Sequence, residues 1–202
     1  MHATMLLPHL FMADLYTREG QGATALKHHK KALALTNDDE LKTRVLYQMG
    51  TLYYETNQLS AMKEILPQGL TSKINYPPLN NLLAYYYATK GKDIDQAQKL
   101  IELALAKDPE NEHFLDTQGV IYYKQQKYDQ ALAIFEKIAK TNAHDYTIIK
   151  NWGKTLLKLG RFEQAKGSIE QALTLAKTPY DKKKCENLLK NCTTSLDEKK
   201  ST

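Results

Sequence analysis

The sequence lacks long hydrophobic runs and has almost no cysteine. No stretch approaches the roughly 18 consecutive apolar residues that a membrane-spanning helix requires. The two cysteines, Cys185 and Cys192, are seven residues apart in a segment with helical spacing. A helix would hold their Cα atoms about 10 Å apart, beyond the roughly 7 Å limit for a disulfide. We therefore expect two reduced thiols, which indicates a reducing compartment and a cytoplasmic location. Because no membrane-spanning run is present, we also expect no membrane partner.

The amino terminus lacks the basic segment of a secretory signal peptide. The stretch MHATMLLPHLFMADLY contains an apolar patch, but no Lys or Arg precedes it, and Pro8 and His9 interrupt it. We interpret the patch as one face of a helix. No obvious cap precedes its apolar side chains, so self-association through this end of the chain is an open alternative. These side chains are Leu6, Leu7, Leu10 and Phe11.

Catalytic and metal-binding patterns are missing as well. No serine, cysteine or carboxylate pair has a suitable base and orienting partner. The triplet GKT at 153–155 resembles the end of a phosphate-binding loop, but Ile148 stands where the earlier glycine is required. His28 and His29 have no HExxH motif or Cys/His cluster beside them, so we interpret them as a polar helix face. We expect no enzyme activity, no catalytic residue, no metal and no cofactor.

The composition is that of a folded chain with an uneven charge distribution. Hydrophobic residues make up 42% and charged residues 25% of the 202 residues, and the mean hydropathy is −0.55, which indicates neither disorder nor a membrane protein. The net charge of +5 comes from the carboxyl-terminal end. Residues 146–202 hold 12 Lys/Arg against 6 Asp/Glu, whereas residues 1–145 hold 16 against 17.

Residues 112–179 contain the same pattern twice, 34 residues apart. The first copy is EHFLDTQGVIYYKQQKYDQALAIFEKIAKTNAHD and the second is YTIIKNWGKTLLKLGRFEQAKGSIEQALTLAKTP. Five matches of small or apolar residues at one offset indicate an internal repeat. The aligned pairs are Gly119 with Gly153, Tyr122 with Leu156, Ala131 with Ala165, Phe135 with Ile169, and Ile138 with Ala172.

This period and this small/aromatic pattern resemble the tetratricopeptide repeat, a helix-turn-helix unit. The resemblance implies an all-α fold, a right-handed α-α superhelix (solenoid) of tetratricopeptide-type helical hairpins whose units contact only their neighbours. The earlier units are looser copies. Pro67 and Gly69 are expected to shorten or end the second helix of the second unit. In the third unit Leu83 stands where the family usually has Gly.

We expect one continuous array over residues 1–196. A polar break at 37–40 can cap the helix that follows it. An array leaves its last apolar face uncovered, so a final helix with a polar outer face is expected there. The repeats are about 6–40, 41–75, 76–111, 112–145 and 146–179, followed by a capping helix over 180–196 and a flexible tail over 197–202.

Small residues in the pattern are expected to let the two helices of a unit approach closely. Gly119 and Gly153 would face Ala131 and Ala165 at the helix crossings. The aromatic positions would fill the space between helices and seal each unit against the next. These packing residues are Tyr53, Tyr86, Tyr122, Phe135 and Ile169.

In the tetratricopeptide family, function resides on the inner, concave face, built mainly from the first helix of each unit. The resemblance therefore implies ligand contacts beside the packing positions. The ligand-binding candidates are Tyr47, Gln48, Thr51, Tyr54, Asn80, Asn81, Tyr87, His113, Asp116, Thr117, Tyr123, Lys150, Asn151, Lys154 and Lys158.

Two subsets of these candidates carry the chemical expectation. Tyr54, Tyr87 and Tyr123 occupy one position in successive units and should form a ladder of phenols that suits an extended peptide or a helix; alternatively they complete the packing. Lys150, Lys154 and Lys158 lie four residues apart and form one stripe of a helix. The stripe favours an acidic ligand segment, unless it is only a solvated face.

The sequence thus predicts a non-catalytic scaffold or adaptor that binds a peptide or helix of a partner protein. One alternative is an accessory or regulatory module, or a chaperone of a larger assembly or secretion system. The other is a basic nucleic-acid-binding repeat protein, against which Asp116 in the middle of the groove and the slightly acidic residues 1–145 argue.

Overall fold

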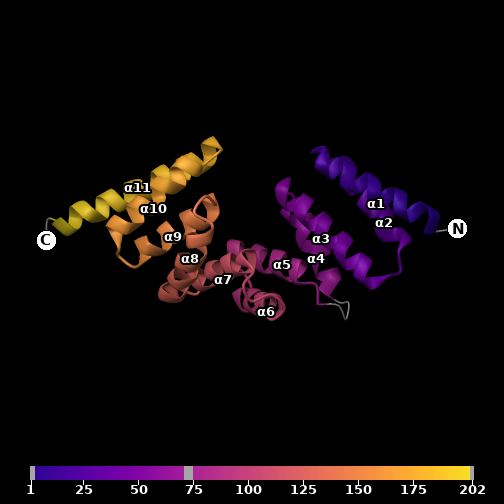
Figure 1. The fold of residues 1–202 in the computed structure, drawn as a ribbon, viewed down its shortest axis with the longest axis horizontal. Helices are drawn as coiled ribbons and strands as arrows, with labels where there is room; N and C mark the ends of the chain where they lie inside the picture. The colour runs from indigo at the N-terminus through magenta and orange to yellow at the C-terminus, as the bar shows by residue number, and fades with distance from the viewer. Residues whose placement is uncertain (1–2, 71–74, 201–202) are drawn as a thin grey trace. The chain divides into compact units, whose positions relative to one another are not determined.

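The computed structural model describes residues 3–70 and 75–200, and these residues form eleven helices and no strand (Figure 1). The all-α prediction is confirmed. The helices are α1 (Ala3–Arg18), α2 (Gly22–Leu35), α3 (Asp39–Glu55), α4 (Leu59–Leu70), α5 (Pro77–Lys90), α6 (Ile94–Leu105), α7 (Glu112–Lys124), α8 (Tyr128–Thr141), α9 (Tyr146–Lys158), α10 (Phe162–Leu175) and α11 (Pro179–Lys200).

Helices that follow one another in the sequence pack together within two compact units. The first unit holds residues 1–86 and 99–108, and the second holds residues 87–98 and 109–202. In the first unit α1 packs on α2, α2 on α3, and α3 on α4; in the second α7 packs on α8, α8 on α9, α9 on α10, and α10 on α11. The predicted hairpin architecture is therefore present in each unit. A single continuous superhelix stays a prediction.

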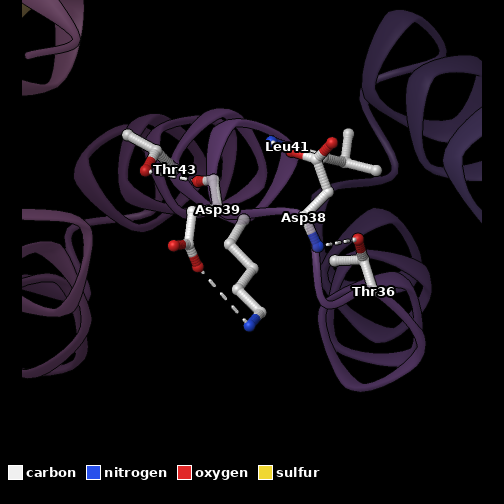
Figure 2. Close-up of polar contacts among 6 residues, drawn as sticks. Thr36, Asp38, Asp39, Leu41 and Thr43 are labelled. Atoms are coloured by element: carbon white, nitrogen blue, oxygen red, sulfur yellow. Dashed lines mark hydrogen bonds and ion pairs between the residues drawn. The ribbon is translucent and has the colours of Figure 1, made fainter. Parts of the chain in front are cut away.

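Polar residues cap the amino-terminal ends of α3, α7 and α9, each of which is the first helix of its repeat. The Asp38 carboxylate accepts a hydrogen bond from the backbone N–H of Leu41 at 2.9 Å, and the Asp38 N–H donates to the Thr36 hydroxyl at 3.1 Å (Figure 2). Asn111 and Asp145 cap α7 and α9 in the same way, 34 residues apart. These caps satisfy N–H groups that have no partner inside the helix. The predicted cap at 37–40 is confirmed.

Each first helix ends in a turn with a residue in the left-handed region. Gly20, Gly91 and Gly160 have φ of 73°, 64° and 71°, and Asn57 and Gln126 take the same place with φ of 56° and 62°. Glycine adopts this conformation freely, and asparagine tolerates it. Gln126 is the member of this set for which the left-handed backbone is most costly.

Replacing Gln126 by glycine should therefore raise the free energy of unfolding by about 1 kcal/mol, because it relieves the left-handed strain that Gly160 avoids at the matching position. Thermal or urea unfolding followed by circular dichroism would measure the change. Ala133→Gly, at an exposed position inside α8, is the control and should lower stability by about 1 kcal/mol. A loss of stability in Gln126→Gly would contradict the strain argument.

Glycines at the helix crossings permit the close approach that the sequence predicts. A Cβ atom at Gly119 would lie 2.7 Å from two ring atoms of Phe135, and one at Gly153 would lie 2.6 Å from Cγ1 of Ile169. The facing residue is thus one turn beyond the expected Ala131 and Ala165. Phe135 and Ile169 are both fully buried, as predicted for the seal between helices.

Of the three tyrosines that the sequence predicts to pack between helices, one is buried and two are partly exposed. Tyr53 is 5% exposed and belongs to the core. Tyr86 and Tyr122 are partly exposed instead. The Tyr122 hydroxyl accepts a hydrogen bond from the Gln118 amide at 3.3 Å, so its polar end lies at the rim of the core.

The irregular second and third units retain their helices by local adjustments. Helix α4 continues through Pro67 and Gly69 to Leu70, and it is 12 residues long against 14 for α2. Gly69 has a packing role, because a Cβ there would lie 2.7 Å from Cδ1 of Leu79 on α5. Leu83, at the usual glycine position of the third unit, is buried with 1% exposure.

Helix α11 covers α10 at the end of the second unit and runs further than expected. Its two cysteines are fully buried free thiols. Burial raises the pKa of both thiols. The helix continues to Lys200, past the end at residue 196 that the sequence predicts for the capping helix, while residues 201–202 lie outside the described residues. The flexible tail stays a prediction. An apolar spacing cannot show where an exposed helix ends.

Candidate partner-binding surface

In the first unit, α3 presents two tyrosines that are held by other rings. Tyr47 packs edge to face against Tyr76, with ring centroids 5.6 Å apart, and Tyr54 packs in the same way against Tyr85 at 5.9 Å. Tyr54 is 40% exposed and Gln48 is also exposed. Ring contacts fix the orientation of a phenol and leave one face for a ligand. The α3 candidates are therefore accessible and ordered.

The asparagines of α5 differ from this expectation. Asn80 is 2% exposed, and its amide donates to the Asn75 side chain at 2.6 Å, while the Asn75 amide donates to the Leu103 carbonyl at 3.3 Å. Asn80 thus holds the start of α5 inside the unit. Asn81 has a buried carbonyl oxygen without a hydrogen-bond partner. On α3, the candidate Thr51 donates its hydroxyl proton to the Tyr47 carbonyl of the same helix at 3.1 Å.

In the second unit, the candidates on α7 divide into accessible and buried positions. His113 is exposed in the first turn, whereas Thr117 is 2% exposed and donates its hydroxyl proton to the His113 carbonyl at 3.1 Å. Tyr123 and Tyr87 are partly exposed, and the ring of Tyr123 packs edge to face against Tyr128 at 5.4 Å. Thr117, like Asn80, is buried in this structure. The ladder of phenols stays a prediction.

Lys150 and Lys154 lie over aromatic rings rather than beside carboxylates. The Lys150 ammonium is 4.5 Å from the centroid of the Tyr146 ring, and the Lys154 ammonium is 4.9 Å from that of Tyr123. Neither lysine forms an ion pair with a carboxylate of the described residues. A ring holds an ammonium in place without neutralising its charge. Lys158, the third member of the stripe, is exposed.

Helix α11 adds a third cation to this surface. Lys184 lies with its ammonium 4.1 Å from the centroid of the Tyr180 ring. Burial lowers the pKa of Lys150, and the charge of Lys184 lowers it further. The pKa of Lys154 is also lowered, by burial first and then by the charges of Lys150, Lys124, Lys184 and Lys158. We call Lys150, Lys154 and Lys184 the lysine cluster; its mutual repulsion would be relieved by a bound anion.

Asp116 is the acidic group that adjoins the lysine cluster. Burial raises the pKa of its carboxyl to about 6, although a hydrogen bond from the Asn151 amide at 3.4 Å and the charge of Lys150 act in the opposite direction. A carboxyl with this pKa is largely ionised at neutral pH and becomes protonated as the pH falls through about 6. Asp116 therefore neutralises the lysine cluster only in part, and less as the pH falls.

The position of α11 beside α9 depends on Tyr146. Its hydroxyl donates to the Asp181 backbone carbonyl at 3.4 Å, and burial raises the pKa of this phenol. The Thr178 hydroxyl donates to the Asp181 carboxylate at 2.7 Å and accepts from the Asp181 N–H at 3.1 Å, which caps α11. Sequence reasoning missed Tyr146, Tyr180 and Lys184 as site residues, because it assigned α11 a covering role alone. The basic run at 182–184 was the available signal.

The remaining predictions concern other kinds of site. The apolar face of α1 is exposed as expected from the sequence, with Leu7 69%, Phe11 68% and Met5 58% exposed. Self-association through it stays a prediction. In the part of the chain that the structure describes, no helix is long and apolar enough to cross a membrane. The same residues contain no group of three or more His, Cys, Asp or Glu side chains arranged to hold a metal ion.

Comparison with known proteins identifies the repeat. A family model described as "Tetratricopeptide repeat" matches residues 9–43, and one described as "Anaphase-promoting complex, cyclosome, subunit 3" matches residues 90–172. The repeats of this chain are of the tetratricopeptide type. Its architecture is that of a helical-repeat scaffold, which is consistent with protein-protein interaction.

Solved tetratricopeptide structures share the fold of this chain. The APC/C hetero-tetramer Cut9-Hcn1 superposes with a TM-score of 0.74 at 16% identity, over 89% of this chain and 34% of that one. MamA of Desulfovibrio magneticus RS-1 superposes with a TM-score of 0.68 at 14% identity, over 85% of this chain and 94% of that one. At these identities the likeness shows the fold alone.

Curated relatives are longer proteins. The chain is 24% identical over 189 residues to the "BBSome complex member BBS4 homolog" of Drosophila melanogaster, covering 93% of this chain and 37% of the relative. It is 28% identical over 169 residues to the "TPR repeat-containing protein YpiA" of Bacillus subtilis, covering 79% of this chain and 39% of the relative. The tetratricopeptide chain thus spans about a third to two fifths of the length of these relatives.

Proposed function

We propose that this protein is an interaction scaffold whose second unit binds an acidic segment of a partner protein. The lysine cluster and the aromatic rings beneath it, on α7, α9 and α11, form the contact surface. The supporting observation is that Lys150 and Lys154 are partly buried and held over tyrosine rings without a carboxylate partner in the described part of the chain. Carboxylates of a ligand would supply that partner.

A protein segment suits this surface better than nucleic acid does. The phenols of Tyr123 and Tyr146 offer apolar faces beside the ammonium groups, which matches a peptide that alternates acidic and apolar side chains. Asp116 and Asp181 lie in the same region and would repel a continuous phosphate backbone. Nucleic acid therefore becomes an outcome of the test rather than the expected ligand.

The relatives suggest the setting in which such a surface would act. One curated relative is named as a BBSome complex member, and one structural neighbour is an APC/C hetero-tetramer. Both names describe multi-subunit assemblies or their components. We infer by analogy that this chain also acts as an adaptor within an assembly, with the acidic segment belonging to a neighbouring subunit.

A defined peptide can test the binding proposal directly. The probe is a fluorescein-labelled peptide of about 12 residues that alternates Glu and Leu, measured by fluorescence anisotropy. The double variant Lys150→Gln/Lys154→Gln should bind about tenfold more weakly, since it loses two charge-assisted contacts. Lys166→Gln is the matched control, because Lys166 lies on α10 and already pairs with Glu170 at 4.0 Å. Its affinity should match that of the wild type.

Two results would contradict the proposal. Equal binding by the wild type and the double variant would show that the peptide uses another surface. Tight binding of a single-stranded oligonucleotide of equal charge, with a steep salt dependence that the peptide lacks, would favour the nucleic-acid alternative. Helicity measured by circular dichroism should be unchanged in each variant, since all substituted side chains reach the surface.

A further inference from the structure

Two histidines from different helices meet at the surface of the first hairpin. His9 lies on α1 and His28 on α2, and their Nδ1 atoms are 3.0 Å apart. The ring centroids are 5.1 Å apart, and the Tyr16 ring of α1 lies 5.5 Å from the His28 ring. Both histidines are partly exposed. A proton on one Nδ1 is shared with the lone pair of the other, since two protonated Nδ1 atoms would repel each other.

The separation of the two nitrogens matches a chelating pair. From this geometry we propose that His9 and His28 form a binding site for a divalent transition-metal ion of the Cu²⁺ or Ni²⁺ type, which would join α1 to α2. Binding requires the ring that carries the shared Nδ1 proton to take up a proton on Nε2 as it gives that one to solvent, so both rings stay neutral with no net release of a proton, and water completes the coordination. Neutral imidazole is the protein ligand that suits these ions.

The distance also indicates which geometry the site would favour. Two nitrogens 3.0 Å apart, each about 2.05 Å from a shared ion, subtend an angle of about 94° at that ion. This value fits the cis positions of a square-planar or octahedral ion. A tetrahedral ion such as Zn²⁺ would require the nitrogens to separate to about 3.3 Å. The site should therefore bind Ni²⁺ and Cu²⁺ in preference to Zn²⁺.

The charged groups around the histidine pair affect how tightly a metal ion would bind and how binding depends on pH. Burial, then the charges of His9 and Lys31, lowers the pKa of His28. Lys31 also disfavours a second cation nearby, and no carboxylate joins the pair in the described residues. We therefore expect moderate affinity and loss of binding as the pH falls.

Little in the linear sequence indicates that His9 and His28 form a pair. The two residues are 19 positions apart and belong to different helices, whereas the adjacent His28 and His29 drew attention as a dipeptide. Adjacent residues on a helix do not share a face. The pair exists because the turn at 19–21 folds α2 back along α1.

Nickel titration tests the proposal. Ni²⁺ is used because it does not oxidise the free thiols, and isothermal titration calorimetry at about pH 7.5 measures its binding. All proteins carry His2→Gln and an extended amino terminus, since His2 and the terminal amine lie outside the described residues and could chelate Ni²⁺ themselves. The wild-type pair should bind one Ni²⁺ per chain and raise the unfolding temperature, as a ligand of the folded state does. Zn²⁺ should bind more weakly.

Matched histidine variants decide whether the pair is responsible. His9→Asn and His28→Asn should each weaken Ni²⁺ binding at least tenfold and abolish the rise in unfolding temperature. His113→Asn and His144→Asn, at positions in the second unit, should leave both unchanged. Absence of Ni²⁺ binding by the wild-type pair would overturn the proposal, and so would undiminished binding by His9→Asn. The peptide assay on the second unit is independent of either result.

Discussion

Gly153→Val should lower the free energy of unfolding by about 3 kcal/mol. A Cβ at this position would lie 2.6 Å from Cγ1 of Ile169 and 3.3 Å from the backbone nitrogen of the same residue. Ile169 is fully buried, so its side chain has no free space to move into, and the backbone of α10 cannot yield without disturbing the contact with α11. The two methyl groups of valine would aggravate the overlap.

Chemical denaturation followed by circular dichroism would measure this effect. Gly167→Ala provides the control, because Gly167 lies inside α10 and a Cβ there would meet nothing within 4 Å, so the protein should gain about 1 kcal/mol from helix propensity. The double variant Gly153→Ala/Ile169→Ala should be more stable than the sum of the single changes, since removal of Cγ1 makes room for the new methyl group. Additive losses, or an unchanged stability in Gly153→Val, would contradict the close approach.

The fold could be predicted largely because its packing positions recur. Gly119 and Gly153, and Phe135 and Ile169, are set by contacts inside one hairpin, which the 34-residue period repeats. Such positions appear in the sequence as matches. The capping residues Asn111 and Asp145 recur at the same interval, for the same reason.

The site could be predicted less well because burial beside a packing position depends on the neighbouring hairpin. Asn80 and Thr117 were expected to be accessible, yet a loop asparagine covers the first and the second turns its hydroxyl into its own helix. Nothing in the period distinguishes them from Lys150 or Tyr54. The contributions of Lys184 and of the His9–His28 pair require knowledge of which helices lie side by side, and this is a tertiary property.

Asp116→Asn should stabilise the protein above pH 6 and leave it unchanged in strong acid. The native pKa of about 6 lies above the ordinary value of 3.8, so the native state binds the proton more tightly than the unfolded chain does. The stability that this proton contributes is present below about pH 4 and is lost as the pH rises through 6. Asparagine remains neutral, accepts the Asn151 hydrogen bond, and avoids that loss. The expected gain at pH 7.5 is about 2 kcal/mol.

Urea unfolding of both proteins between about pH 4 and pH 8 would measure this difference. The curves should converge toward pH 4 and separate through pH 6. Asp145→Asn is unsuitable as a control because it alters the cap of α9, whereas Asp129→Asn, at an exposed position of α8, should not reproduce the effect. A constant difference at every pH would assign the gain to packing and contradict the role of the carboxyl.

Asp116→Asn should also change the affinity of the protein for the acidic peptide. Ionised Asp116 offsets part of the charge of Lys150, so Asp116→Asn should strengthen binding of the acidic peptide severalfold at about pH 7.5. Wild-type affinity should rise as the pH falls from about 7.5 to 5.5, where the glutamates of the peptide remain ionised. His113 also adjoins Asp116, so the comparison belongs in a His113→Gln background, which removes this second ionisable group. If Asp116→Asn retains the full pH dependence there, the carboxyl does not control the lysine cluster.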